Sequence, residues 1–169
     1  KPSHRKVLFC ALKKLKNKQL KVAQFAGAVS ADSSYHHGEA SLMGVIINLA
    51  QDFIGSNNIN YLEPKGQFGS RVLAGKDAAS PRYIFTQLEK ISSTIFSSLD
   101  SPLLKYLDDD GQLIEPSYYF PVVPMLLING SDGIGTGYST FIPPHNPKDI
   151  LKNLDRLMNN EEPKEMKPW

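Results

Sequence analysis

Four consecutive residues, Ser80-Pro81-Arg82-Tyr83, combine side chains that suit phosphate chemistry. Ser80 is a good helix N-cap and Pro81 a good first helical residue, so the sequence predicts that a helix begins here. The first turn of a helix has unpaired backbone N–H groups that favour anions, and Arg82 would add a cation to them. Tyr83 would place a phenolic nucleophile beside a bound phosphate. The motif indicates phosphoryl transfer through tyrosine, and the alternative is that Tyr83 is a half-buried packing residue.

A second candidate group consists of His36, His37 and Glu39. Imidazoles titrate near neutrality, so these histidines can donate to a phosphate or assist proton transfer. A metal site is a poorer interpretation, because the stretch offers few ligands and its spacing is not that of the H-E-x-x-H zinc motif. The remaining alternative is a polar turn that caps the following helix.

The acidic run Asp108-Asp109-Asp110-Gly111 looks like part of a calcium loop but fails its spacing rule. With Gly111 at the sixth position of such a loop, Tyr106 and Ser117 occupy the first and twelfth positions, where carboxylates are required. An Asp-Gly turn between two short strands fits the sequence better.

The glycine-rich run 129–137 contains an isolated apolar residue, Ile134, between Gly133 and Gly135. The run is neither the G-x-G-x-x-G dinucleotide motif nor a phosphate-binding P-loop. An apolar side chain on an exposed turn can wedge between base steps and kink a duplex. A plain tight turn is the alternative.

Apolar periodicity and turn residues predict the elements that must position these groups. Three helices are expected in the first third of the chain, followed by a hairpin, which is the layout of a winged-helix domain. The expected elements are helices over 5–15, 21–29 and from Gly38 to about Gly55, a hairpin over 60–75, a helix from Ser80, a buried strand over 125–128 and a helix from Asn146.

The chain has 169 residues and a net charge of +2, and its 41% hydrophobic and 21% charged residues are ordinary for a globular protein. Every charged residue before Asp32 is Lys or Arg. This basic segment indicates a face that meets a polyanion, and the alternative is a solvated lysine-rich helix.

Cys10 is the only cysteine, which excludes disulfides and fits a reducing compartment. No apolar run is long enough for a membrane span, and the two ends lead us to expect a fragment of a longer protein.

The order and spacing of several motifs resemble the DNA cleavage core of eukaryotic-type DNA topoisomerase II, from one end of the chain to the other. The motifs are Lys21-Val22-Ala23-Gln24, Tyr35-His36-His37-Gly38-Glu39, Gly55-Ser56-Asn57-Asn58, Gly66-Gln67-Phe68-Gly69, Gly75-Lys76-Asp77-Ala78-Ala79, Ser80-Pro81-Arg82-Tyr83-Ile84, Ile128-Asn129-Gly130 and Gly133-Ile134-Gly135-Thr136-Gly137. The resemblance implies an α+β fold. Residues 1–118 would form a winged-helix domain with the catalytic tyrosine, and residues 119–169 the incomplete start of an α/β tower domain.

The same resemblance assigns roles to individual residues. Tyr83 would attack a DNA backbone phosphate, leaving a covalent 5′-phosphotyrosine and a free 3′-hydroxyl, while Arg82 would hold the scissile phosphate. His36 and His37 would line the cleavage site, and Ile134 would intercalate and bend the DNA. Further candidates for contacts with the DNA backbone are Lys13, Lys14, Gln67 and Lys76.

The resemblance also implies an ATP-dependent isomerase that acts on double-stranded DNA as a homodimer. Mg²⁺ and ATP would be bound by a TOPRIM domain and an ATPase domain outside this chain, which itself would hold no metal. We therefore expect the fragment alone not to cleave DNA. The expected location is the nucleus, or a viral or host compartment for a viral source. Ala40 stands where relatives often carry a longer side chain near the drug pocket, which leaves drug sensitivity open.

Two other functions remain possible from the sequence. A non-catalytic winged-helix module that binds duplex DNA accounts for the helices, the hairpin and the lysines, but gives no purpose to Arg82, Tyr83 or Ile134. A structural scaffold that binds no nucleic acid is opposed by the basic segment at the start of the chain.

Overall fold

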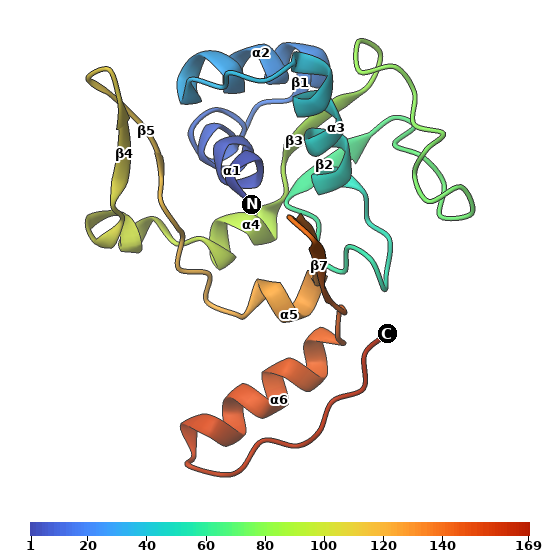
Figure 1. The fold of residues 1–169 in the computed structure, drawn as a ribbon, viewed down its shortest axis with the longest axis vertical. Coiled ribbons are helices and arrows are strands. Elements are labelled where there is room, and N and C mark those ends of the chain that lie inside the picture. Colours follow the sequence, from blue (N-terminus) through green and yellow to red (C-terminus); the bar gives the residue numbers. More distant parts are fainter. The chain divides into compact units, whose positions relative to one another are not determined.

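The computed structural model describes residues 1–169, which contain both helices and short strands, several of them in pairs along the chain (Figure 1). The mixed content of helix and strand confirms the predicted α+β class. The chain divides into two compact units. The first consists of residues 1–51 and 60–122, and the second of residues 52–59 and 123–169.

Three helices supply most of the core of the first unit: α1 (Pro2–Lys14), α2 (Val22–Ser33) and α3 (Glu39–Ala50). Their predicted apolar stripes are buried, which confirms these helices. The core residues that they contribute are Val7, Cys10, Ala11, Val22, Phe25, Ala26, Val29, Leu42, Ile46, Leu49 and Ala50. Helix α3 ends earlier than the predicted Gly55, because the backbone of Gln51 is extended, with ψ of 133°.

An antiparallel sheet of three strands lies against these helices, in the order β1 (Leu20–Lys21), β3 (Phe85–Leu88), β2 (Leu62–Lys65). The predicted hairpin within residues 60–75 is wrong in its pairing. Strand β2 exists, but its partner is β3, with Leu62 opposite Leu88 and Lys65 opposite Phe85. The residues between the two strands, 66–84, form a long connection of turns instead of a second hairpin strand.

The predicted helix from Ser80 is also wrong, because residues 81–83 form a turn and β3 follows. The apolar residues Ile84 and Leu88 are four apart, a spacing that fits one face of a helix and one face of a strand equally well. Thr86 lies between them and is fully buried, which shows the two-residue period of a strand. Pairing with strands on both sides therefore decides the conformation.

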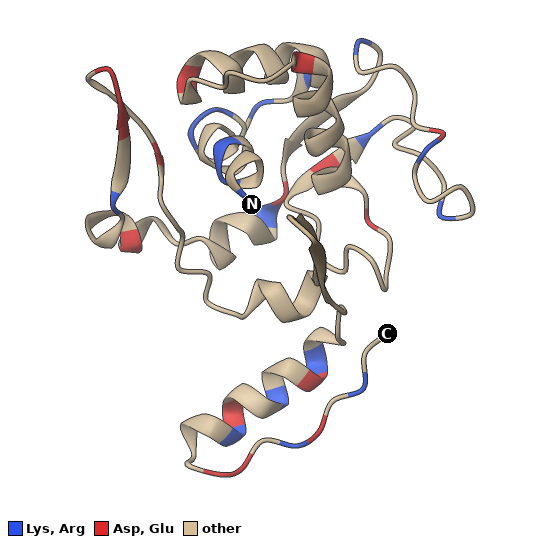
Figure 2. Ribbon diagram, in the orientation of Figure 1, with Lys and Arg blue, Asp and Glu red and all other residues tan.

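The first unit ends with α4 (Lys90–Ile95), the 3₁₀ helix η1 (Ser98–Leu103) and a hairpin of β4 (Tyr106–Asp109) and β5 (Gln112–Pro116). The predicted Asp-Gly turn is confirmed. Asp110 and Gly111 both have positive φ, 50° and 86°, as the tight turn of a right-twisted hairpin requires. Figure 2 shows the acidic residues gathered at this turn.

The second unit contains α5 (Met125–Asn129), a hairpin of β6 (Ser131–Gly135) and β7 (Tyr138–Ile142), and α6 (Pro147–Met158). The predicted strand over 125–128 is wrong, because Pro124 starts a helical turn and its carbonyl accepts from the N–H groups of Leu127 and Ile128. The predicted helix at Asn146 is confirmed, with the Asn146 side chain accepting from Lys148 N at 3.0 Å.

Two asparagines tie the short segment 52–59 into the second unit. Asn58 Nδ2 donates to the carbonyl of Ile128 at 2.6 Å and to that of His145 at 3.0 Å. Asn129 exchanges two hydrogen bonds with the backbone of Ile59, at 2.9 and 2.8 Å. These contacts explain why a segment so early in the sequence belongs to the later unit.

Candidate functional site

Tyr83 stands at the end of the turn that precedes β3. The turn is closed by a hydrogen bond of 2.9 Å from Tyr83 N to the carbonyl of Ser80. Tyr83 is 72% exposed and Arg82 is exposed, whereas the next residue, Ile84, is 2% exposed and belongs to the core. A buried anchor therefore holds a phenol and a guanidinium, on consecutive residues, at the surface.

The same turn serves as the cap of helix α2. Lys21 makes no side-chain cap, and instead Val22 N donates to the carbonyl of Ile84 at 3.0 Å and Ala23 N to that of Pro81 at 3.1 Å. The first N–H groups of α2 are therefore satisfied by the turn. With no helix at Ser80, the anion-binding terminus predicted there is absent. The positive charge for a phosphate at this turn comes from the Arg82 guanidinium.

Four of the predicted site residues lie on the connection between β2 and β3. They are Gln67, Lys76, Arg82 and Tyr83, and all four are exposed. The carbonyl of Gln67 accepts from Ala79 N at 2.9 Å, which closes the loop between them. Figure 2 shows Lys and Arg along this connection, and the sequence has a single acidic residue there.

That acidic residue is Asp77, and its carboxylate is engaged within the loop. Asp77 Oδ1 accepts from Ser70 N at 2.7 Å, and this hydrogen bond holds the pKa of the Asp77 carboxyl below its usual value. The carboxylate is thus used to shape the loop. The Lys and Arg side chains of the connection are exposed to solvent, and such a group of positive charges suits a polyanionic ligand.

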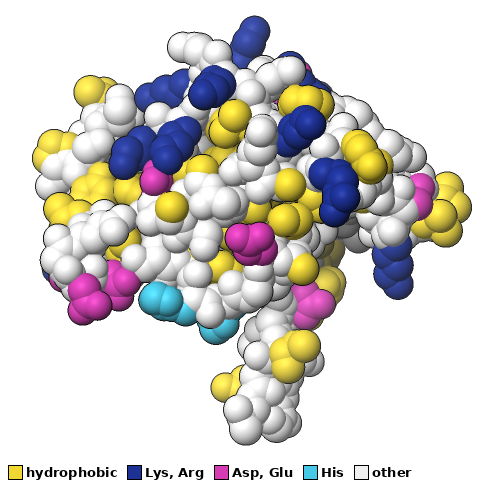
Figure 3. Space-filling model, turned by 90° about the horizontal axis from the view of Figure 1, so that it is seen from above, with side chains coloured by type: hydrophobic (Ala, Val, Ile, Leu, Met, Phe, Trp, Pro, Cys, Tyr) yellow, Lys and Arg dark blue, Asp and Glu magenta, His cyan; other side chains and the backbone are white.

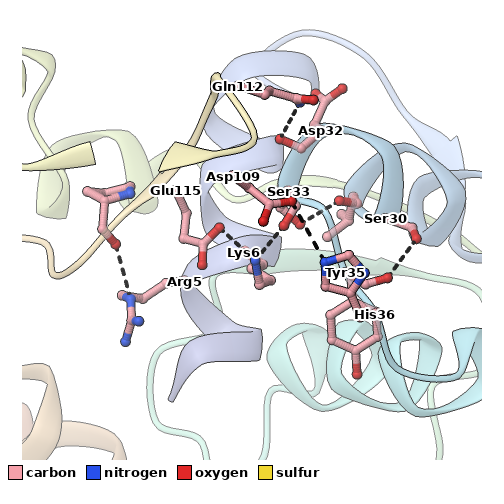
Figure 4. Close-up of polar contacts among 12 residues, drawn as sticks. Arg5, Lys6, Ser30, Asp32, Ser33, Tyr35, His36, Asp109, Gln112 and Glu115 are labelled. Atoms are coloured by element: carbon pink, nitrogen blue, oxygen red, sulfur yellow. Dashed lines mark hydrogen bonds and ion pairs between the residues drawn. The ribbon is translucent and has the colours of Figure 1, made fainter. Parts of the chain in front are cut away.

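The histidines lie between α2 and α3, next to the acidic hairpin (Figure 4). His36 Nε2 is 3.7 Å from Asp109 Oδ2, and the ring of His37 packs edge-on against Tyr35 with centroids 5.4 Å apart. Figure 3 shows histidine side chains at the surface with acidic side chains near them. An open cleft of about 540 Å³ beside them is lined by Lys6, Tyr35, His36, His37, Ser41 and Asp109.

A buried ion pair fixes the hairpin that reaches these histidines. Lys6 Nζ is 2.9 Å from Glu115 Oε2, and it also donates to the carbonyl of Ser33. Arg5 Nε donates to the carbonyl of Pro116 at 3.1 Å (Figure 4). Strand β5 is thereby held against α1, which places Asp109 beside His36.

Lys13 and Lys14 occupy the last turn of α1, and both approach Asp32. Lys14 Nζ lies 2.9 Å from Asp32 Oδ1, and this interaction raises the pKa of Lys14, whereas Lys13 Nζ lies 4.0 Å from Oδ2. Both lysines are exposed, so their ion pairs with Asp32 are expected to contribute little to stability.

Ile134 belongs to the second unit, where it lies in β6 opposite Ser139. It is 97% exposed. Its neighbours Gly133 and Gly135 leave room for the partner strand, because a Cβ on Gly135 would lie 3.3 Å from the Tyr138 ring and one on Gly133 3.0 Å from Thr140 Oγ1. The hairpin thus presents one unsupported apolar side chain between two glycines.

No group of three or more His, Cys, Asp or Glu side chains lies close enough together to hold a metal ion. The residues of this chain therefore offer no fit to the Mg²⁺ that the resemblance implies. No helix is both long and apolar enough to cross a membrane.

Sequence reasoning missed three residues that shape the site. Glu115 is an acidic residue in a strand, and Asp109 belonged to a run interpreted only as a turn. Gln51 follows an apolar helix, and its buried amide contacts the β2–β3 connection. A single sequence carries no signal for these partners, because each lies far along the chain from the group that it contacts.

Comparison with known proteins shows the family to which the chain belongs. The family model that describes the A-type subunits of DNA gyrase and topoisomerase IV matches residues 1–169. The chain therefore belongs to this DNA gyrase/topoisomerase IV family.

Individual relatives narrow the comparison to the eukaryotic type II enzymes. The chain is 57% identical over 169 residues to DNA topoisomerase 2 of Candida albicans and 56% identical to DNA topoisomerase 2 of Bombyx mori. These matches cover 100% of the chain but only 12% and 11% of the two relatives. A crystal structure of the Plasmodium falciparum topoisomerase II DNA-binding, cleavage and re-ligation domain matches with a TM-score of 0.96 at 56% identity, over 100% of this chain and 23% of that one.

Proposed function

We propose that this chain is part of a type II DNA topoisomerase and carries its nucleophile, Tyr83. The observation that carries the proposal is the exposed Arg82-Tyr83 pair, held on a turn that caps α2 in a chain of this family. The name of the Plasmodium relative, a DNA-binding, cleavage and re-ligation domain, describes the same activity. In the full-length protein, paired cleavages would open one duplex for the passage of another.

The proposed reaction is a transesterification with no net loss of bond energy. The Tyr83 oxygen attacks a backbone phosphorus, a bond from Tyr83 oxygen to phosphorus forms, and the bond from phosphorus to the 3′-oxygen breaks. The phenolic proton is removed and a proton reaches the departing 3′-oxygen, which leaves as a hydroxyl. Religation is the reverse. A tyrosine hydroxyl needs activation to act as a nucleophile at neutral pH.

The Arg82 guanidinium supports both directions of the reaction. Its planar, permanently charged group can hold two phosphate oxygens and stabilise the charge that develops on them. Because its backbone is fixed by the bonds from the turn to α2, little reorganisation is needed when the phosphate arrives. His36 and His37 would contribute hydrogen bonds or proton transfer from the segment before α3.

Duplex DNA would be bound by elements of both units. Residues 1–118, with helices α2 and α3 and the β2–β3 connection, would form the winged-helix domain. Lys13, Lys14, Gln67 and Lys76 would contact the DNA backbone. Residues 119–169 would begin a tower domain, in which Ile134 wedges between base steps. Insertion of an apolar side chain unstacks a step and bends the duplex.

The other requirements of the activity would be met outside this chain. ATP and Mg²⁺ would be bound by other parts of a homodimeric full-length protein. The nucleus, or a viral or host compartment, is the expected site of action. We expect the isolated chain to bind duplex DNA without cleaving it.

The test is substitution of Tyr83→Phe in the full-length enzyme, with Tyr118→Phe as the matched control, because Tyr118 is also an exposed tyrosine, at 47%. Denaturation during reaction with labelled duplex traps covalent adducts. We expect adducts from the native enzyme and the control, and none from Tyr83→Phe. Adducts that persist in Tyr83→Phe would sink the assignment, and a native enzyme that binds DNA but never forms an adduct would favour a non-catalytic winged-helix module.

A further inference from the structure

The side chain of Gln51 joins the end of α3 to the connection between β2 and β3. Gln51 is 8% exposed, and its Nε2 donates to the carbonyl of Phe68 at 2.8 Å and to that of Gly75 at 3.2 Å. Phe68 is a core residue, 4% exposed. One buried amide therefore donates to the backbone carbonyls at both ends of the segment 68–75. Buried carbonyls need such hydrogen-bond donors.

The segment is closed tightly around this amide. Gly69 and Gly75 have φ of 97° and 77°, in the left-handed region that favours glycine. A Cβ on Gly69 would lie 2.6 Å from Gly75 Cα, and a Cβ on Gly75 would lie 2.2 Å from Gln51 Nε2. The two glycines thus allow a close approach in which there is no room for a methyl group.

Backbone hydrogen bonds also close the loop immediately before the turn that carries the proposed nucleophile. Gly75 N donates to the carbonyl of Ser70 at 2.8 Å, and Ala79 N donates to that of Gln67 at 2.9 Å. Four residues after Ala79 comes Tyr83, in the turn whose carbonyls cap α2. The loop that Gln51 holds and the turn that carries Arg82 and Tyr83 are therefore consecutive in the chain, and each is closed by its own backbone hydrogen bonds.

We propose that Gln51 is a positioning residue for the cleavage site. It fixes the segment 68–75 against the end of α3, and the Gln67–Ala79 hydrogen bond passes that constraint to the Arg82-Tyr83 turn. Gln51 touches neither DNA nor the reacting atoms in this role. Its effect on cleavage rests on the proposed function, whereas its effect on the loop does not.

The first experiment measures the loop alone, by amide hydrogen exchange in the full-length enzyme without DNA. Gln51→Met keeps the length of the side chain and removes both donors. We expect the amides of Gly75, Lys76 and Ala79 to exchange at least tenfold faster in this variant. Ser92→Ala is the matched control, because it removes another hydrogen bond of the same unit, from the Oγ of the buried Ser92 to the carbonyl of Tyr61 at 2.9 Å.

The second experiment compares DNA binding with covalent adduct formation. We expect Gln51→Met to lower the adduct yield at saturating DNA about tenfold while the dissociation constant changes less than threefold. If Gln51→Met acted only by lowering overall stability, its adduct yield and its DNA affinity would fall together, as they would in Ser92→Ala. Gly75→Ala should reproduce the defect by displacing the amide, and the double variant should be no worse than either single one. Gly111→Ala controls for backbone strain, because its φ is 86° and a Cβ there meets nothing within 4 Å.

Exchange of the loop amides at native rates in Gln51→Met would overturn the proposal, whatever the activity. Faster exchange with an adduct yield equal to that of Ser92→Ala would overturn the link to Tyr83. Should Gln51→Met fail to fold, Gly75→Ala carries the same two measurements. Failure of the proposed function itself would be seen separately, as adducts that survive Tyr83→Phe.

Discussion

Tyr83 and Arg82 owe their exposure to the residues around them. Ile84 is buried beneath the turn, and the carbonyls of the turn are bonded to the first amides of α2. A nucleophile on such a turn is held in place by a core residue and by a helix. In the proposed reaction, the fixed backbone of the turn would reduce the movement that Arg82 and Tyr83 need when a phosphate arrives.

At the residue scale, we expect the ion pair of Lys6 and Glu115 to contribute strongly to the free energy of unfolding. Their side chains are 15% and 2% exposed. Lys6→Met leaves the Glu115 carboxylate buried without its cation, which costs about 3 kcal/mol. We expect the free energy of unfolding, measured by urea denaturation of the chain, to fall by about that amount.

The double variant Lys6→Met with Glu115→Leu serves as the control for this pair. Replacing both charges removes the need to desolvate either, so most of the lost stability should return. If Lys6→Met alone were as stable as the native chain, the pair would not be what fixes β5 against α1.

At the scale of elements, the three helices of the first unit could be predicted from the sequence because each has an apolar stripe at helical spacing. Strand β3 could not, since Ile84 and Leu88 fit a helix and a strand alike, and only β1 and β2 on either side decide between them. Helix α5 could not be predicted either, because its short apolar run shows no helical or strand period.

The candidate site could also be predicted only in part. Arg82, Tyr83 and Ile134 could be predicted from their residue types and neighbours. Gln51 could not, because its hydrogen-bond partners are distant in sequence.

The hairpin of β6 and β7 carries its own prediction about DNA bending. Ile134 is 97% exposed, and a wedge at this position should affect the bend angle of the duplex more than the affinity for DNA. We expect Ile134→Ala in the full-length enzyme to reduce the bend angle measured by energy transfer, with the dissociation constant raised less than tenfold. Leu151→Ala is the control, an exposed apolar residue of the same unit at 50%. A bend angle equal to that of the native enzyme would remove Ile134 from this role.

At the scale of the whole molecule, the chain covers 11–12% of the relatives it matches. Its two units carry different parts of the proposed activity, with the nucleophile on the first and the wedge on the second. Neither unit contains an acidic cluster that could hold a metal ion. The proposals about Tyr83, Gln51 and Ile134 therefore concern the full-length enzyme, of which this chain is a small part.

The central claim, that Tyr83 becomes covalently joined to DNA, is tested most directly by locating the adduct. Trapped adducts of the native full-length enzyme are digested with nuclease and trypsin, and the peptide that carries a nucleotide is identified by mass spectrometry. The account predicts a nucleotide on the peptide Tyr83–Lys90, or on 77–90 where the modification blocks cleavage after Arg82. A nucleotide found on a peptide that lacks Tyr83 would contradict it.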